Sequence, residues 1–343
     1  MRGVRDCGEG VEVVGGGIRA SLSAARSLPI RYHPANAPPL QALRMPRKAL
    51  RIRLAALALA CLVTAAPAAR AQAGAESRDG IAVGGQSTVA RLVSAERLER
   101  EAASQYRALL SEAASQGALA PDGHAQLQRL RRIAARITPH AARFNERAPQ
   151  WKWEVNLIGS KQVNAFCMPG GKIAFFTGIL DTLKLTDDEV GVVMAHEMAH
   201  ALREHGRERA AKSAIAQGVA IGASILSQWL GYGDLGGMVA QTGAKYTMLK
   251  FSREDETEAD LVGMDLAARA GFDPRAGVKL WEKMAAAGKR QPPQWMSTHP
   301  AHETRIDEIR RNLGKVMPLY ARATGRPLAS LPPYRSNLGQ PVR

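Results

Sequence analysis

Residues 192–200 read V-V-M-A-H-E-M-A-H, and the H-E-x-x-H motif inside this stretch organises the interpretation of the whole chain. Side chains four places apart on a helix lie on one face, so the rings of His196 and His200 can reach one metal ion. The apolar residues around the two histidines predict a buried helix, which argues against a pair of solvated histidines on a surface helix. The stretch therefore predicts a metal site inside a domain.

Glu197 is the candidate catalytic base beside the predicted metal. It follows His196 directly, so its carboxylate lies on a neighbouring flank of the helix and can accept a proton from water bound to the metal. Zinc lowers the pKa of such water to about 7, which provides a hydroxide-like nucleophile at neutral pH. We therefore expect a hydrolase with Glu197 as general base.

A catalytic zinc also needs a third protein ligand and one open position. The extended motif H-E-x-x-H-x-x-G-x-x-H is absent, because Arg203 and Gly206 stand where it requires glycine and histidine. His205 falls five places after His200, which is outside that pattern. The acidic segment 251–260 is the best remaining source of the ligand, although such a run is commonly a solvated helix face. Spacing alone does not separate its carboxylates.

The expected fold is α+β, a mostly helical zincin-type metallopeptidase domain with a small antiparallel β-sheet beside the motif helix. Thr186 and Glu189 form a capping box, which predicts that the motif helix begins there and runs to about Arg209. The apolar runs predicted as strands are 151–158, 163–167 and 173–176, with a Pro-Gly-Gly hairpin turn at 169–171. Further helices are predicted at 89–114, at 124–147 with an interruption near Pro139, and at about 247–270, 274–287 and 303–313.

Four motifs in order resemble those of one metallopeptidase family. They are N-A-F at 164–166 before the turn, H-E-x-x-H, S-R-x-x-E-x-x-A-D at 252–260, and S-T-H-P at 297–300 with Arg305. This pattern resembles the gluzincin metallopeptidases, which include the CaaX prenyl endopeptidase, the heat-shock protease HtpX and periplasmic or mitochondrial quality-control proteases. The resemblance covers about residues 90–315 and is closest to short single-domain periplasmic members.

The resemblance implies a role for individual residues and one Zn²⁺ per chain. Glu256 stands at the place of the third zinc ligand, and Asp260 at that of a carboxylate that orients a ligand histidine. His299 matches a residue that either stabilises the oxyanion or caps the zinc in a resting state, and Arg305 matches a supporting cation. The segment implied to bind extended substrate as an added strand comprises Val163, Asn164, Ala165 and Phe166.

The N-terminal part is typical of a targeting segment. From Met45 a basic head leads into an apolar run at 54–66 and then into small residues that end at Ala73, which are the parts of a secretory signal peptide. Cleavage after Ala71 or Ala73 satisfies the A-x-A rule. Cys61 lies within the apolar run, where lipidation is the weaker interpretation because no Leu stands three places before it.

These signals predict the organisation of the chain. The expected parts are a non-native or disordered extension at 1–44, the signal peptide at 45–73, a linker at 74–90, the zinc metallopeptidase domain at 91–320 and a Pro-rich tail at 321–343. Cleavage would leave Cys167 alone, so no internal disulfide is expected. The predicted location is the periplasm of a Gram-negative bacterium, either free, membrane-associated or lipid-anchored.

Composition bears on the partners of the protein. The net charge is +16, but aromatic residues make up 5% of the chain and do not alternate with basic clusters, so we expect no binding to nucleic acid. The basic surface could instead hold the domain near anionic lipid, as a peripheral membrane association. The Gly- and Ala-rich stretch 211–243 favours a helical hairpin packed on the domain, with lipid contact or a plug in the cleft as open alternatives.

The sequence thus favours a zinc-dependent endopeptidase that degrades misfolded or misassembled cell-envelope proteins. Substrate would pair with the edge strand, and Glu197 would move the proton of the attacking water to the leaving amine. The alternative is a zinc-stabilised periplasmic chaperone or assembly factor with little turnover. Equal rescue of an envelope defect by the wild type and Glu197→Gln would favour that alternative.

Overall fold

The computed structural model describes residues 79–217, 251–288, 294–299 and 303–337. The chain divides into two units, residues 1–74 and 75–343, and every described residue belongs to the second. The predicted N-terminal extension, the signal peptide and most of the 211–243 stretch therefore lie outside the described residues. Among the described helices, none combines the length and the apolar character that crossing a bilayer requires.

Three strands form a mixed sheet in the order β1-β3-β2, namely β1 (Glu154–Ile158), β2 (Ala165–Met168) and β3 (Lys172–Phe176). β2 and β3 form the predicted antiparallel hairpin, with Gly170 and Gly171 at φ 81° and 77°, a conformation that favours glycine. β1 pairs with β3 in parallel, so the expected antiparallel sheet is corrected to a mixed one. The composition of a strand does not reveal which neighbour it will pair with. β2 lies at one edge.

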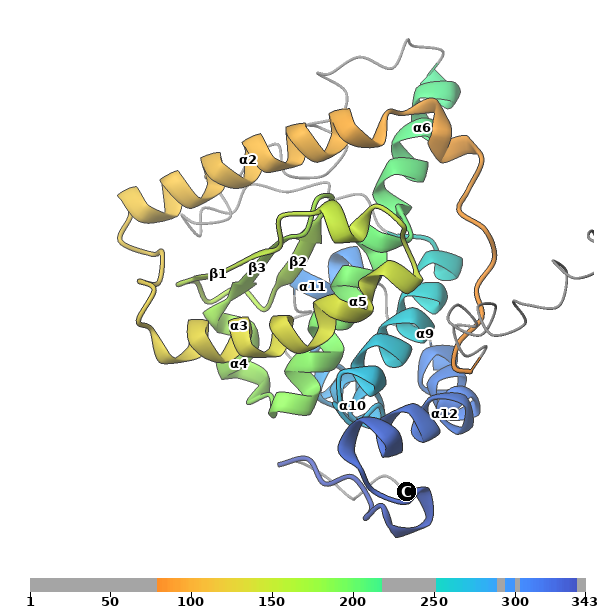
Figure 1. The fold of residues 1–343 in the computed structure, drawn as a ribbon. Coiled ribbons are helices and arrows are strands. Elements are labelled where there is room, and N and C mark those ends of the chain that lie inside the picture. The colour runs from red at the N-terminus through yellow and green to blue at the C-terminus, as the bar shows by residue number, and fades with distance from the viewer. Residues whose placement is uncertain (1–78, 218–250, 289–293, 300–302, 338–343) are drawn as a thin grey trace, which may run out of the picture. The chain divides into compact units, whose positions relative to one another are not determined.

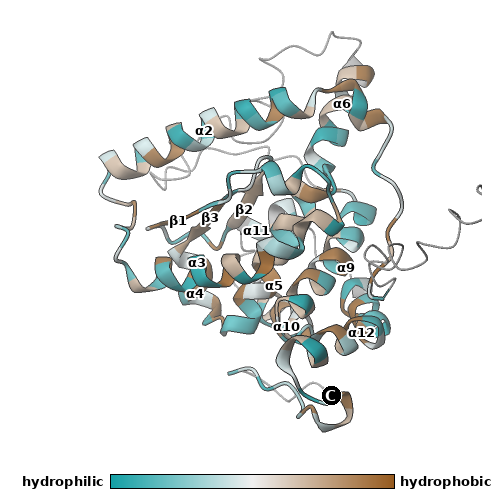
Figure 2. Cartoon of the chain, viewed as in Figure 1, coloured by the Kyte–Doolittle hydropathy of each residue, from teal (hydrophilic) through white to brown (hydrophobic). Residues whose placement is uncertain are grey.

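Helices cover both faces of this sheet (Figure 1). They are α2 (Ala95–Ser115) on one face, and α3 (Ala125–Ile137) and α5 (Asp187–Leu202) on the other. Successive side chains of a strand point to opposite faces, so Phe175 joins the main core under α3 and α5 while Phe176 packs with Tyr106 of α2. Apolar residues concentrate on the strands and on α5, between the layers (Figure 2). The α+β class is confirmed.

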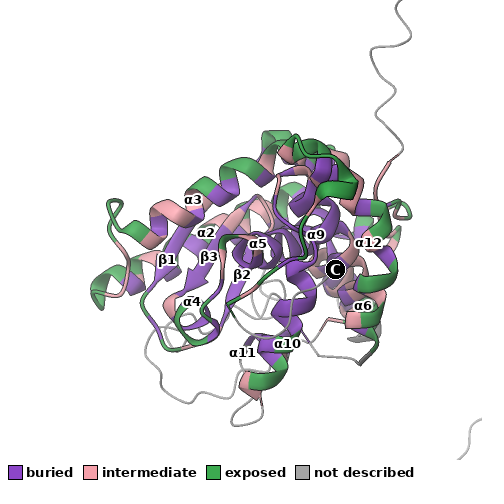
Figure 3. Ribbon diagram, turned by 90° about the horizontal axis from the view of Figure 1, so that it is seen from below, coloured by how far each residue is buried: buried purple, intermediate pink, exposed green. Residues whose placement is uncertain are grey.

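The predicted capping box starts α5. The Thr186 hydroxyl accepts a hydrogen bond from the Glu189 backbone at 3.3 Å, and Glu189 accepts one from the Thr186 backbone at 2.8 Å. From Glu189 to its end at Leu202, α5 is buried (Figure 3). The H-E-x-x-H motif therefore lies in the core, as its apolar flanks predict.

The end of α5 differs from the prediction. The helix stops at Leu202 instead of near Arg209, and a separate helix α6 (His205–Gln217) begins after a break. Glu204 in the break adopts the left-handed conformation with φ 58°. Asparagine or glycine is the usual signal for such a turn, and glutamate gives none.

α9 (Arg253–Arg269) packs directly against α5. Gly263 permits the close approach, because a Cβ atom built there would lie 3.0 Å from the backbone nitrogen of His196. A second capping box, of Ser252 and Asp255, starts α9 and sets where its first turn faces α5. The two helices that carry the sequence motifs therefore lie side by side.

The remaining helices enclose this pair. They are α4 (Thr177–Leu183), α10 (Ala276–Gly288), α11 (Gln294–Thr298) and α12 (Glu303–Thr324), with 3₁₀ turns at Val89–Leu92, Thr138–Arg143, Ala148–Gln150 and Leu328–Ser330. α12 runs well past the predicted end at residue 313 and into the predicted tail. The predicted linker is packed in part, because Ile81 is buried and its backbone N–H donates to Asp265 at 2.8 Å.

Candidate metal centre

His196 and His200 project from α5 towards one point. Their Nε2 atoms lie 3.1 Å apart, and both side chains are buried. Two ligands held at ~2.0–2.1 Å from a tetrahedral zinc ion would lie about 3.3 Å apart. The separation of the two nitrogens therefore suits a shared ion.

Glu256 reaches the same point from the first turn of α9. Its Oε2 lies 3.6 Å from Nε2 of His196, and its Oε1 lies 3.6 Å from Nε2 of His200. The side chain is fully buried. The resemblance, and not the spacing of the acidic run, pointed to this carboxylate.

His299, which directly follows α11, completes the cluster. Its Nδ1 lies 3.3 Å from Nε2 of His196 and 2.9 Å from Oε1 of Glu256. One ligand atom from each of the four residues His196, His200, Glu256 and His299 lies within 4.8 Å of the others. Imidazole nitrogens and a carboxylate are ligands that zinc prefers, so the residues present fit a zinc ion.

Asp260 and Arg305 lie behind the ligand atoms. Oδ1 of Asp260 is 3.1 Å from Nδ1 of His196, and Arg305 donates two hydrogen bonds of 2.7 Å to the same carboxylate. Nη1 of Arg305 also lies 2.5 Å from Oε2 of Glu256. The guanidinium is held over the ring of Trp281 at 3.8 Å, so one buried cation connects both carboxylates.

Burial and neighbouring charges act together on the protonation of these groups. Burial, reinforced by the adjacent imidazoles, holds the pKa of His200 well below its usual value, so the ring is neutral and able to coordinate. Burial opposes the charge on Asp260, but Arg305 outweighs it and lowers the pKa to about 2. Burial also opposes the charge on His299, yet the neighbouring carboxylates, Glu197 foremost, raise its pKa.

Trp295 of α11 is a site residue that the sequence analysis missed. Its Nε1 donates a 2.5 Å hydrogen bond to Oε1 of Glu197, and its ring stacks on His299 with centroids 4.7 Å apart. The residue is completely buried. Trp295 stands four residues before His299, and this spacing alone does not indicate a contact with Glu197.

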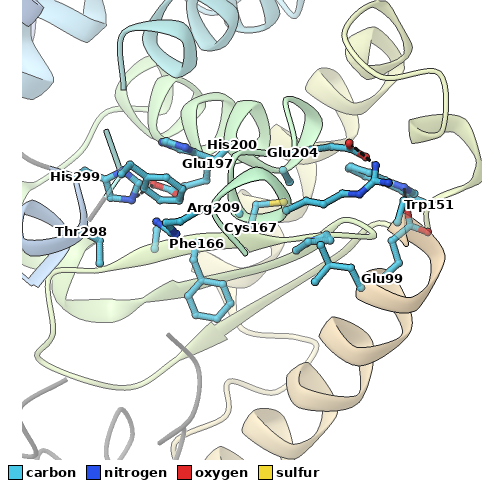
Figure 4. Close-up of a pocket in the computed structure, with 18 of the residues that line it drawn as sticks. Glu99, Trp151, Phe166, Cys167, Glu197, His200, Glu204, Arg209, Thr298 and His299 are labelled. Carbon is cyan, nitrogen blue, oxygen red and sulfur yellow. Dashed lines mark hydrogen bonds and ion pairs between the residues drawn. The ribbon is translucent and has the colours of Figure 1, made fainter. Parts of the chain in front are cut away.

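A hollow of about 820 Å³, including its open mouth, lies beside the four-residue cluster (Figure 4). Glu197 and His200 of α5 line one wall, and residues 164–166 line the wall opposite. Glu99 and Trp151 lie at the far end (Figure 4). The hollow therefore reaches His200 and His299 of the cluster from the side of the sheet.

The segment predicted to bind substrate lies partly in this hollow. Asn164, Ala165 and Phe166 line it, whereas the carbonyl of Val163 accepts a 3.0 Å hydrogen bond from the backbone of Trp295. β2 begins only at Ala165, so the first two residues of the segment precede the strand. Nδ2 of Asn164 is buried and has no hydrogen-bond partner in the described part of the chain.

Comparison with known proteins gives one family and several relatives. The family model described as "Peptidase family M48" matches residues 125–313. The chain is 38% identical over 153 residues to mitochondrial metalloendopeptidase OMA1 of Arabidopsis thaliana, covering 45% of this chain and 30% of the relative. It is 39% identical over 164 residues to OMA1 of Schizosaccharomyces pombe, covering 46% of each chain. It is 30% identical over 179 residues to the beta-barrel assembly-enhancing protease of Escherichia coli, covering 49% of this chain and 36% of the relative. The chain thus spans less than half the length of these relatives.

Proposed function

Because this chain belongs to peptidase family M48, we propose that it is a zinc-dependent endopeptidase whose metal is held by His196, His200 and Glu256. One observation carries the proposal: two imidazole Nε2 atoms lie 3.1 Å apart and each lies 3.6 Å from an oxygen of one buried carboxylate. Three such ligands would leave the fourth position of a tetrahedral zinc ion to water, substrate or His299.

Zinc, when bound, supplies a Lewis acid for the scissile carbonyl and lowers the pKa of water. Glu197 is proposed as the general base that takes the proton of the attacking water and passes it to the leaving amine. The hydrogen bond from Trp295 supports this role, because it holds one carboxylate oxygen and leaves the other to receive a proton. His299 is proposed to stabilise the developing oxyanion or to cap the zinc in a resting state, and Arg305 supports the carboxylates of Glu256 and Asp260.

Substrate is proposed to bind as an added strand along Val163, Asn164, Ala165 and Phe166. The position of β2 at the edge of the sheet supports this, because an edge strand offers unpaired backbone groups to a peptide. The unpartnered Nδ2 of Asn164 supports it as well, since a buried donor gains most from a peptide carbonyl.

The proposed substrates are misfolded or misassembled proteins of the cell envelope, and the proposed location is the periplasm. The relative from Escherichia coli is named a beta-barrel assembly-enhancing protease, which supports an envelope substrate. The predicted signal peptide at residues 45–73 supports export. The net charge of +8 on residues 74–343, which hold 36 basic and 28 acidic residues, supports a peripheral contact with anionic lipid.

Proteolysis of an unfolded protein such as casein by the purified full-length chain tests the proposal. Glu197→Gln keeps the size of the side chain and an acceptor for Trp295 but removes the base, so cleavage should fall about 10²–10⁴-fold while zinc stays bound. Glu208→Gln on α6 is the matched control, because Glu208 pairs with Lys212 and does not line the hollow. Cleavage by Glu197→Gln at the wild-type rate would contradict the proposal and favour the chaperone alternative.

A further inference from the structure

We propose that His205 and Glu258 are positioning residues for the metal centre, and that they fix the ring orientation and the proton of His200. The inference rests on the proposed function in one respect, since it takes His200 to be a metal ligand. His205 stands outside the extended zincin pattern, and none of the roles described above involves it.

The side chains of His200, His205 and Glu258 form a continuous series of contacts, in which both histidines are buried and Glu258 is partly buried. Nδ1 of His205 lies 2.9 Å from Nδ1 of His200, and Nε2 of His205 lies 2.8 Å from Oε2 of Glu258. His205 is 2% exposed. Nη2 of Arg203 lies 3.1 Å from the other oxygen of Glu258, which holds that carboxylate in place.

Only one placement of the ring protons satisfies this series of hydrogen bonds. If Nε2 of His200 offers its lone pair to a metal, the ring must carry its proton on Nδ1. That N–H can donate only to an unprotonated Nδ1 of His205, whose proton must then lie on Nε2 and be donated to Glu258. A ligand histidine is commonly oriented in this way by an acceptor on its other nitrogen. Here the acceptor is a second imidazole.

The backbone is shaped to bring His205 to this position. On an uninterrupted helix His205 would project about 140° around the axis from His200 and would not meet its ring. The left-handed Glu204, at φ 58°, ends α5 and starts α6 in a new direction. A non-glycine residue in this conformation is strained, and such strain is concentrated at functional sites.

Phe251 also contacts His200, and this contact has a different effect on the ring. The ring of Phe251 stacks on His200 with centroids 3.8 Å apart and an interplanar angle of 27°. Stacking limits the tilt of the imidazole, but it does not choose which nitrogen carries the proton. The hydrogen bond to His205 determines which nitrogen of His200 carries the proton.

Zinc affinity of the purified full-length chain tests the inference, measured by competition with a chromophoric chelator. We expect His205→Phe and Glu258→Gln to lose about 10–100-fold in zinc affinity. His205→Gln should recover part of that loss, because its amide can accept from His200 and donate to Glu258. The double variant His205→Phe/Glu258→Gln should lose no more than His205→Phe alone, since both act through one chain of hydrogen bonds.

Matched controls separate positioning from general stability. His140→Phe replaces a partly buried imidazole on the 3₁₀ turn at Thr138–Arg143, and Glu208→Gln removes an ion pair on α6. Both should bind zinc as the wild type does. Zinc affinity within twofold of wild type for His205→Phe, or no recovery in His205→Gln, would overturn the inference. Because zinc binding is measured without a substrate, a failure here is distinct from a failure of the proposed peptidase activity.

Discussion

The indole of Trp295 donates a 2.5 Å hydrogen bond to Oε1 of Glu197, and it joins α11 to the motif helix α5 at the proposed general base. The same indole stacks on His299, so one side chain contacts two residues of the centre. Both contacts are buried. The orientation of the Glu197 carboxylate therefore depends on a segment distant in sequence.

Replacing Trp295 with phenylalanine should lower kcat while leaving zinc bound. Phenylalanine preserves stacking on His299 but removes the N–H that holds Glu197, and a hydrogen bond to a charged group contributes about 1.5–3 kcal/mol. We expect kcat for casein-type proteolysis to fall about 10–100-fold. Trp153→Phe removes a 3.3 Å indole hydrogen bond to Ala148 and should leave kcat unchanged. Equal kcat for both variants and the wild type would refute this role of Trp295.

Asp260→Asn should weaken zinc binding. The substitution keeps the shape of the side chain but removes the charge that lies 3.1 Å from Nδ1 of His196 and that Arg305 contacts twice. Changes in such supporting carboxylates typically reduce metal affinity about 10–100-fold. Chelator competition measures the effect, with Asp122→Asn as the control because that residue forms an ion pair on the surface with Arg131. A chelator titration that superimposes on the wild type would count against the supporting role of Asp260.

Lys283→Met should destabilise the fold without removing any residue of the metal centre. Nζ of Lys283 lies 2.7 Å from Glu189 at the start of α5, and both side chains are almost fully buried, so the loss leaves a buried carboxylate without its cation. Breaking such a pair costs about 3–5 kcal/mol. Urea unfolding of the zinc-free protein measures this loss in the free energy of unfolding. Lys212→Met breaks a pair in which the lysine is 63% exposed and should cost at most about 1 kcal/mol. Similar losses of unfolding free energy in the two variants would show that the buried pair contributes no more to stability than the exposed pair.

Gly263→Ala should separate α9 from α5. Its Cβ would lie 3.0 Å from backbone atoms of His196, so one helix must shift, and overpacking of this kind costs about 1–3 kcal/mol. Because Glu256 is carried by α9, zinc affinity should fall together with stability. Gly314→Ala on α12 meets no atom within 4 Å and is the control. Unchanged zinc affinity in Gly263→Ala would mean that the spacing of the helices does not set the centre.

The sequence predicts the local features of this domain better than its long-range ones. The capping box at Thr186 and the turn at Gly170 are encoded by residues close together in the chain, and both were predicted. The parallel pairing of β1 with β3 depends on contacts between residues distant in sequence, and the sequence analysis did not predict it. The early end of α5 was missed because Glu204 adopts a left-handed conformation that its residue type does not signal.

The candidate site was predicted unevenly for the same reason. The helical spacing of His196 and His200 suffices to place their rings together. The choice of Glu256 among several acidic residues came from the resemblance, because the packing of α9 on α5 decides which carboxylate faces the histidines. Trp295 and His205 reach the centre through tertiary packing and a strained turn, which no local pattern reports.

The central claim is that two imidazoles of α5 and one carboxylate of α9 hold a single zinc ion. Diffraction data from crystals of the zinc-loaded protein, collected at the zinc absorption edge, test it most directly. We expect one anomalous peak per chain, about 2.0–2.2 Å from Nε2 of His196, Nε2 of His200 and a carboxylate oxygen of Glu256. A peak elsewhere in the chain, or one at this position that Glu256 does not contact, would contradict it.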